Sequence, residues 1–254
     1  MAQVSEAELR RMEEIMRSTL HRHFVAIYVE ITGDNGKVMR SVFSGFLMSL
    51  NGRWIVGGAG HCFDRVQYHV DRGRKAKRCY LFYSPARVSQ PVAFDWERQR
   101  PWFRFEQVTG IDYGALFLDD QIRGTLQAGD KYPLDESLWD RTDSDADWYV
   151  VYGVPESRTE LTETAIEMTT MFYPLEAVTE TPDLSYEPKV KTFFGRLRPG
   201  VGSVVGVSGG PIFANRKAQY WLHAVQSWQR GKLIGAPLVR PMGLMLREEI
   251  ARRW

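Results

Sequence analysis

The stretch Gly206-Val207-Ser208-Gly209-Gly210-Pro211 sets one serine among three glycines. Glycine tolerates the positive φ angles of a tight turn, so backbone N–H groups beside Ser208 can point inward together. Two segments precede it along the chain, Gly57-Gly58-Ala59-Gly60-His61-Cys62 and Asp112-Tyr113-Gly114-Ala115-Leu116. Histidine can take a proton from a serine hydroxyl, and aspartate can hold the imidazole in the required tautomer. The order His61, Asp112, Ser208 therefore predicts a dispersed serine-nucleophile site, with Asp95, Asp119 and Asp120 as rivals of Asp112.

These segments resemble the chymotrypsin/trypsin-like serine peptidases, whose histidine lies in a Thr-Ala-Ala-His-Cys-like segment and whose serine lies in Gly-Asp-Ser-Gly-Gly-Pro. Three further segments are similar to strands of that family and extend the resemblance over about residues 24–254: Ser44–Ser49 with Trp54–Val56, Val150–Pro155 and Leu222–Trp228. The resemblance implies an all-β fold of two six-stranded antiparallel barrels with the active site between them. It also implies that Ser208 is the nucleophile and that the N–H groups of Gly206 and Ser208 form the oxyanion hole.

The expected organisation is an N-terminal amphipathic helix at residues 1–23 and a peptidase domain at 24–254. Within that domain we expect the first barrel at about 24–125, the second at about 146–240 and a C-terminal helix at about 244–254. Leu9, Met12, Met16 and Leu20 recur near the helical period and form an apolar stripe that needs a cover. That helix either packs on the outside of the barrels or docks a partner protein.

Composition indicates an ordinary globular chain: 254 residues, 44% hydrophobic, 25% charged, with a net charge of +2. This balance predicts no attraction to nucleic acid, and no window has the roughly 18 apolar residues that span a membrane. Secreted members of the family carry several disulfides, whereas this chain has only Cys62 and Cys79. We therefore expect a bacterial-type, cytoplasmic member without an export signal. Cys62 is expected to be a small buried thiol, with a bridge to Cys79 as the alternative.

The residue before the serine departs from the family pattern. Val207 replaces the aspartate that, in zymogen-activated members, binds a newly formed N-terminal ammonium. The oxyanion hole must then form spontaneously or be organised by something else: a regulatory protein partner, an upstream domain or the 1–20 helix. The protein or peptide substrate would in either case bind in the cleft between the barrels.

The expected substrate specificity rests on the match to the family's serine motif. Counting back six residues from Ser208 places Gly202 at the floor of the primary specificity pocket, beside Ser203. The missing aspartate argues against a basic side chain there, because a buried cation would have no partner. The strand with Gln226, Ser227, Trp228 and Gln229 is expected to bind the substrate, and a small, apolar or uncharged polar side chain is expected in the pocket.

No metal ion or organic cofactor is expected. Asp140, Asp143, Asp145 and Asp147 are spaced like a calcium loop, but Trp148 stands where the loop needs glycine. The basic segment 72–78 has no interleaved aromatic residues, which favours an exposed connection. The alternative to a serine endopeptidase is a catalytically silent two-barrel module that binds a peptide in its cleft.

Overall fold

The computed structural model describes residues 14, 18–33, 36–83, 91–142, 145–161, 166–179, 182–184, 186–199 and 204–254. Most of the helix expected at residues 1–23 lies outside these ranges, as do Gly202 and Ser203 of the expected primary pocket. What is described before the first strand includes a single 3-10 turn, η1 (Leu20–His23).

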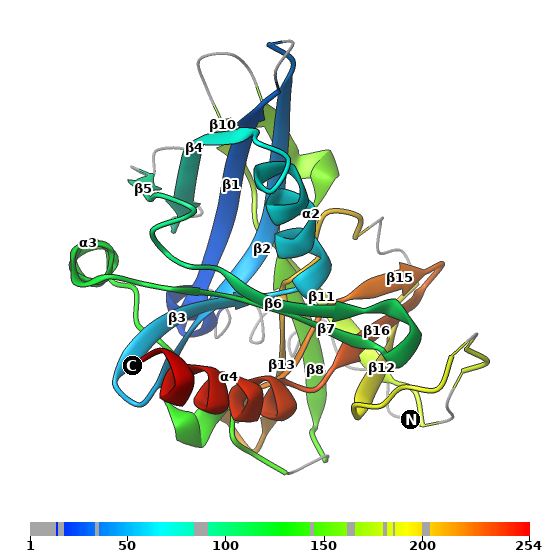
Figure 1. The fold of residues 1–254 in the computed structure, drawn as a ribbon. Coiled ribbons are helices and arrows are strands. Elements are labelled where there is room, and N and C mark those ends of the chain that lie inside the picture. The colour runs from blue at the N-terminus through cyan, green and yellow to red at the C-terminus, as the bar shows by residue number, and fades with distance from the viewer. Residues whose placement is uncertain are drawn as a thin grey trace.

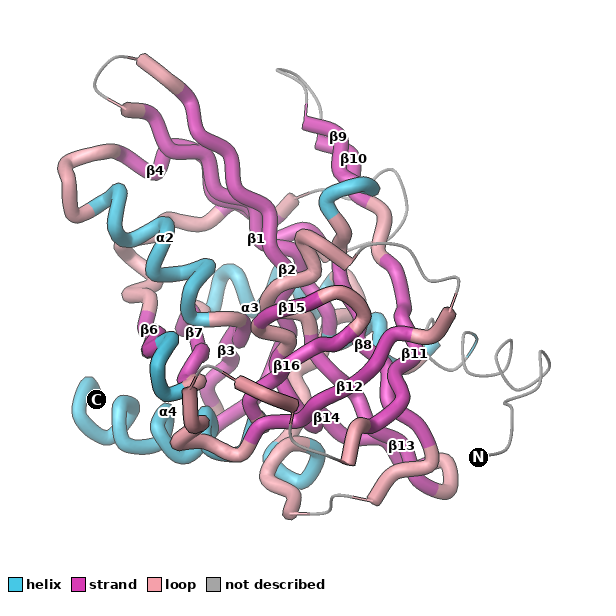
Figure 2. The backbone as a smooth tube through the Cα atoms, turned by 90° about the vertical axis from the view of Figure 1, so that its right-hand side faces the viewer, coloured by secondary structure: helices cyan, strands magenta, loops and turns pink. Residues whose placement is uncertain are grey.

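Two large antiparallel sheets, packed side by side, make up most of the described chain (Figures 1 and 2). The first has the strand order β5-β4-β1-β2-β3-β7-β6. Its strands are β1 (Phe24–Thr32), β2 (Val38–Leu50), β3 (Arg53–Gly58), β4 (Lys75–Phe82), β5 (Val92–Ala93), β6 (Trp102–Glu106) and β7 (Ile111–Phe117).

The second sheet has the order β14-β13-β8-β11-β12-β16-β15. Its strands are β8 (Trp148–Gly153), β11 (Met171–Ala177), β12 (Thr192–Leu197), β13 (Pro211–Arg216), β14 (Gln219–Val225), β15 (Trp228–Arg230) and β16 (Leu233–Pro237). A separate hairpin of β9 (Thr159–Leu161) and β10 (Ile166–Met168) projects from this half (Figure 2).

The all-β class with two antiparallel halves is confirmed, and the strands fall within the residue ranges expected for the two barrels. The strand count differs: each large sheet has seven strands among the described residues instead of six. Edge strands as short as the two-residue β5 add to the count but are too brief to leave a periodic sequence pattern.

One apolar cluster joins the two halves. Phe46 and Tyr113 of the first sheet pack in the same cluster as Phe213 and Leu222 of the second, together with Met242 of the C-terminal helix. All five side chains are at most 1% exposed. Because burial of this size is worth several kcal/mol, the cleft between the sheets has a fixed base.

The helices differ most from the sequence expectations. α4 (Val239–Arg253) begins at Val239 instead of about residue 244, because Pro241 lies in the first turn, where a helix needs no N–H donor. α2 (Gly60–Val70) and α3 (Asp120–Ala128) were not expected. Asp119 caps α3 by accepting the N–H of Ile122 at 2.9 Å. In the described part of the chain, no helix has the length and apolar character to cross a membrane.

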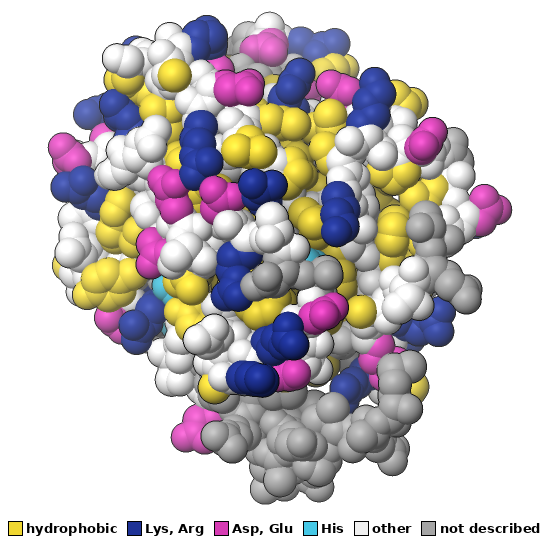
Figure 3. Space-filling view, turned by 90° about the horizontal axis from the view of Figure 1, so that it is seen from below, with side chains coloured by type: hydrophobic (Ala, Val, Ile, Leu, Met, Phe, Trp, Pro, Cys, Tyr) yellow, Lys and Arg dark blue, Asp and Glu magenta, His cyan; other side chains and the backbone are white. Residues whose placement is uncertain are grey.

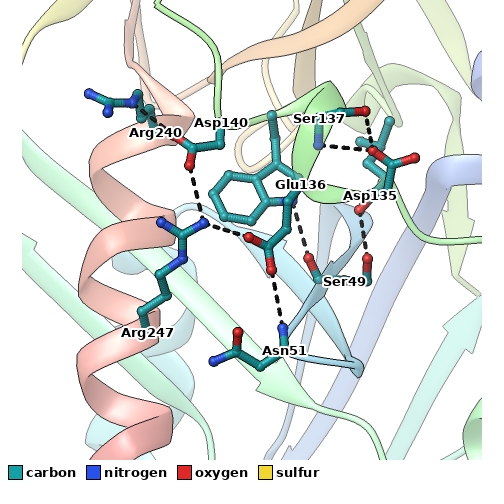
Figure 4. Close-up of polar contacts among 10 residues, drawn as sticks. Ser49, Asn51, Asp135, Glu136, Ser137, Asp140, Arg240 and Arg247 are labelled. Carbon is teal, nitrogen blue, oxygen red and sulfur yellow. Dashed lines mark hydrogen bonds and ion pairs between the residues drawn. The ribbon is translucent and has the colours of Figure 1, made fainter.

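Polar contacts hold α4 against the segment that connects the two sheets (Figure 4). Arg247 contacts both Glu136 and Asp140, and Arg240 donates from Nε to Oδ1 of Asp140 at 2.8 Å. The neighbouring Trp139 is fully buried in the cluster shared by both halves. The first turn of α4 is thereby fixed relative to both sheets.

Candidate active site

His61 lies at the start of α2, directly after β3 ends at Gly58. The backbone here passes very close to β6 and β7. A Cβ atom on Gly60 would lie 2.6 Å from the carbonyl oxygen of Arg104 and 2.7 Å from that of Tyr113. Glycine at position 60 therefore lets the helix begin where His61 faces β7.

Asp112 is the second residue of β7 and is 2% exposed. Its Oδ2 accepts a hydrogen bond from Nδ1 of His61 at 2.7 Å, and its Oδ1 accepts one from the backbone N–H of His61, also at 2.7 Å. One carboxylate thus holds both the ring and the backbone of the histidine. This pairing leaves Nε2 to face the cleft, and neither Asp95 nor Asp119, two of the rival aspartates, has a contact of this kind.

Ser227 adds a third contact to the same carboxylate, because its hydroxyl donates to Oδ2 of Asp112. Its backbone N–H is also engaged, with the carbonyl oxygen of Gly235 at 3.1 Å. The sequence predicts Ser227 as a substrate-binding residue, but its side chain is used to orient Asp112. Asp112 lies on β7 of the first sheet and Ser227 in the connection between β14 and β15 of the second, so no local sequence pattern indicates this contact.

The turn that carries Ser208 depends on two glycines with positive φ. Gly206 has φ +95°, and a Cβ there would lie 2.4 Å from the backbone nitrogen of Glu156. Gly209 has φ +85°, and its Cβ would lie 2.3 Å from the carbonyl oxygen of Ser44. Within the described part of the chain, the N–H groups of Gly206 and Ser208 donate to no acceptor. They remain available for an oxyanion.

Val207 is fully buried, with no exposed surface, in an apolar cluster with Val204 and Ile212. The position that holds an ion-pairing aspartate in the similar family is therefore filled by a hydrocarbon side chain. Hydrophobic burial of valine contributes about 1.5–3 kcal/mol to ordering this turn. The turn is held without a buried charge.

Ser208 and His61 line one cavity of about 460 Å³, together with Cys62. No hydrogen bond joins Ser208 to His61 among the described contacts. Instead, Sγ of Cys62 lies 3.4 Å from Nε2 of His61. Cys62 is half-buried and not in a disulfide, so the expectation of a thiol is correct but that of full burial is not. No sequence pattern indicates this contact, since it depends on the side-chain rotamer.

The protonation of His61 reflects these neighbours. Burial lowers its pKa, but the hydrogen bonds to Asp112 and Cys62, together with electrostatic attraction to both, outweigh burial and raise the pKa to about 10. The site favours the imidazolium, which is the species that forms when histidine takes a proton from a nucleophile.

Two of the other expected substrate-binding residues, Gln226 and Trp228, lie beside this site. The backbone of Gln226 is bonded to the Ser208 turn, accepting from Gly209 N–H and donating to the carbonyl oxygen of Gly210, each at 2.9 Å. Trp228 lines a cavity of about 420 Å³ on the other side of His61. Gln229 donates to the carbonyl oxygen of Gly231 at 2.7 Å.

No protein-family model matches the chain. A comparison with curated proteins finds no match either. The structure, by contrast, is similar to solved structures of serine proteases. The thermostable serine protease AL20 from an extremophilic microorganism is 12% identical, with 91% of this chain and 97% of that chain covered and a TM-score of 0.51. The protease Anisep from Arthrobacter nicotinovorans is 14% identical, with 85% and 90% covered and a TM-score of 0.51.

A scabies mite inactivated protease paralogue, S-D1, is also similar: it is 14% identical, covers 92% of this chain and 94% of its own, and has a TM-score of 0.57. At such low identities the likeness shows the chymotrypsin-like two-barrel fold alone. Since an inactivated paralogue has the same fold as a protease, activity has to be argued from the site.

Proposed function

We propose that the chain is a serine endopeptidase that hydrolyses peptide bonds through an acyl-enzyme. The observation that carries the proposal is the double contact of Asp112 with His61, at 2.7 Å to both the ring and the backbone, beside a cavity that Ser208 also lines. A carboxylate that fixes one ring nitrogen leaves the other to exchange protons with a nucleophile. A histidine with a purely structural role would not need a carboxylate bonded to both its ring and its backbone, in a cavity that also contains Ser208.

In the proposed reaction Oγ of Ser208 attacks the carbonyl carbon of the scissile bond, and its proton passes to Nε2 of His61. The oxyanion accepts hydrogen bonds from the N–H groups of Gly206 and Ser208. Nε2 then protonates the leaving amine as the C–N bond breaks, and water repeats the sequence on the ester. Side-chain rotation of Cys62 or Ser208 brings the hydroxyl to Nε2 in place of the thiol.

Control of the site is the second part of the proposal. Burial of Val207 supports a turn that is ordered without a newly formed N-terminus. A regulatory protein partner, acting through residues 1–23, is the proposed alternative. If the purified chain alone cleaves peptides at rates typical of serine peptidases and no partner alters those rates, the partner hypothesis is wrong.

The test uses a fluorophosphonate probe, which labels an activated serine without knowledge of the substrate. We expect labelling of the wild-type chain, none of Ser208→Ala, and strongly reduced labelling of Asp112→Asn. Equal labelling or equal peptide hydrolysis by Ser208→Ala would refute the assignment. A silent peptide-binding module predicts instead that no labelling occurs while cleft-dependent peptide binding persists in both variants.

The thiols at Cys62 and Cys79 support a reducing compartment. We extend the proposal to a cytoplasmic location, which fractionation of the source cells tests directly.

A further inference from the structure

A third cavity, of about 580 Å³, lies in the second half of the molecule. Its walls come from β8, β12 and β14 and from the first turns of α4. It shares no lining residue with the two cavities that flank His61. Nothing in the proposed peptidase chemistry uses it.

Two side chains on the cavity have polar groups without a hydrogen-bond partner among the residues that the structure describes. His223 is 9% exposed and forms no hydrogen bond with them; its ring packs against the rings of Tyr149 at 5.2 Å and Phe193 at 5.3 Å between centroids. Trp221 also lines the cavity, and its buried Nε1 has no hydrogen-bond partner. Buried donors are nearly always satisfied in folded proteins, because an unpaired one costs about 1–3 kcal/mol. Nε1 of Trp221 has no accessible surface, so the ring of His223 is the group on this cavity wall that can donate to a bound acceptor.

The imidazole of His223 is a neutral group at physiological pH. Burial, and secondly the positive charge of Lys191, lower the pKa of His223 to about 4. A neutral imidazole offers one N–H donor and one acceptor. It can therefore donate to a ligand oxygen without adding a buried charge.

The charged side chains that line the cavity are basic. They are Lys191, Arg141 and Arg240, and none of the described lining residues is Asp or Glu. Asp140, outside the lining, accepts from Arg240 Nε, and the guanidinium of Arg141 lies 4.6 Å from the centre of the Trp221 ring. Lys191 is exposed and forms no ion pair with the described residues. On the face in Figure 3, Lys and Arg side chains lie among hydrophobic and acidic ones.

We propose that this cavity is a binding site for a small molecule with an aromatic body and one oxyanion group, a carboxylate or a phosphate. The aromatic body would pack on Phe193 and Tyr149. The oxyanion would accept from His223 and pair with Lys191, which lines the cavity and forms no ion pair with the described residues. The site is independent of the proposed peptidase activity, because it shares no residue with it.

Direct binding tests the site, with phenylacetate and phenyl phosphate as probes and phenylacetamide as the uncharged control. Isothermal titration of the Ser208→Ala chain removes catalysis from the measurement. We expect sub-millimolar binding of at least one anion and at least tenfold weaker binding of the amide, since a charge-assisted hydrogen bond is lost. The anion that binds more tightly identifies the oxyanion as carboxylate or phosphate.

Two lysine variants localise the binding. Lys191→Gln should weaken anion binding about tenfold, whereas Lys189→Gln, which removes the same charge from an exposed residue outside the cavity, should leave it within twofold. Both residues are exposed, and unchanged thermal unfolding would show that both variants fold. No anion binding at millimolar concentration, equal affinity for the amide, or equal effects of the two variants would overturn the proposal. In contrast, the proposal would be supported if adding the anion shifts the NMR signals of the His223 ring. The spectrum of His223→Gln, which lacks these signals, identifies them.

Discussion

Sγ of Cys62 lies 3.4 Å from Nε2 of His61, on the ring nitrogen that a serine nucleophile has to reach. The opposite nitrogen is held by Asp112 at 2.7 Å. Each ring nitrogen of His61 therefore has a polar neighbour, a carboxylate on one side and a thiol on the other. Under the proposed mechanism the thiol competes with Ser208 for Nε2, which predicts a pH dependence of the site and a sensitivity to position 62.

Replacing Cys62 by alanine should increase peptidase activity near neutral pH. Contact with Cys62 is one of the causes that raise the pKa of His61, so its removal lowers that pKa and releases Nε2. Because the neutral imidazole is the base, activity rises with pH through the pKa of His61, and that limb should move to lower pH in Cys62→Ala. Profiles of kcat/KM from pH 5 to 10 measure the shift, with Cys79→Ala as the buried-thiol control. Superimposable profiles of wild type and Cys62→Ala would contradict the competition.

Replacing Asp112 by asparagine should leave the fold intact and reduce kcat by about 10³–10⁴-fold. The amide cannot stabilise the imidazolium and favours the wrong tautomer, since its NH₂ group can donate to Nδ1. The buried site is nearly isosteric, so circular dichroism should be unchanged. Ser227→Ala, which removes one of three donors to this carboxylate, should show a smaller loss in kcat with KM within about threefold. Wild-type turnover in Asp112→Asn would exclude His61 and Asp112 as a catalytic pair.

Restoring the family's aspartate at position 207 should damage this chain. Val207 is fully buried among hydrocarbon groups, so Val207→Asp would introduce an unpaired buried charge and destabilise the fold by roughly 3 kcal/mol or more. Val207→Ala is the matched control, with an expected loss of about 2 kcal/mol from the lost burial and the cavity. Urea unfolding measures both values. A Val207→Asp chain as stable as wild type would show that a partner for the charge exists.

Stability should fall as the solution becomes acidic from pH 6.5 to pH 4. Burial lowers the pKa of His23 to about 4, and donation from Nδ1 to the carbonyl oxygen of Tyr132 at 2.8 Å only partly offsets it. Between these pH values the unfolded chain binds the proton more readily, so the stabilisation present above pH 6.5 is lost at up to about 1.4 kcal/mol per pH unit for this histidine.

Urea unfolding at pH 7.5, 5.5 and 4.5 follows this loss. His23→Gln cannot titrate and should flatten the slope of unfolding free energy against pH, whatever its stability at pH 7.5. Asp and Glu side chains also titrate in this pH range, but they contribute equally to the slopes of wild type and of His23→Gln, so the difference between the two slopes reports on His23. Identical slopes for variant and wild type would mean that His23 is charged in the folded chain at these pH values.

The sequence was sufficient for much of the fold because strands and turns leave local patterns. The segments around His61, Asp112 and Ser208 resemble those of the chymotrypsin/trypsin-like peptidases, and that resemblance implied the two antiparallel halves and their order. It missed α2 and α3 and the seventh strand of each sheet. Helix α2 follows β3 with only Ala59 between them, and short edge strands have no detectable period.

The pairing of His61 with Asp112 was a prediction from motif order, and the structure brings the two side chains together. The catalytic role of Ser208 stays a prediction that the proposed labelling tests. The contact of Ser227 with Asp112 could not be read from the sequence, because the residues are 115 positions apart and lie in different halves of the fold.

By itself, the sequence determined which residue types stand at the ends of which strands, because backbone propensity and hydrophobic period are local properties. Only the tertiary structure decided that Val207 would be buried, that a thiol would occupy Nε2 of His61, and that His223 would line a cationic cavity. Those outcomes depend on side-chain rotamers and on packing between distant segments, which no short stretch of sequence specifies. The serine between glycines at position 208 indicated the expected chemistry, whereas packing between distant segments determined which groups surround the site.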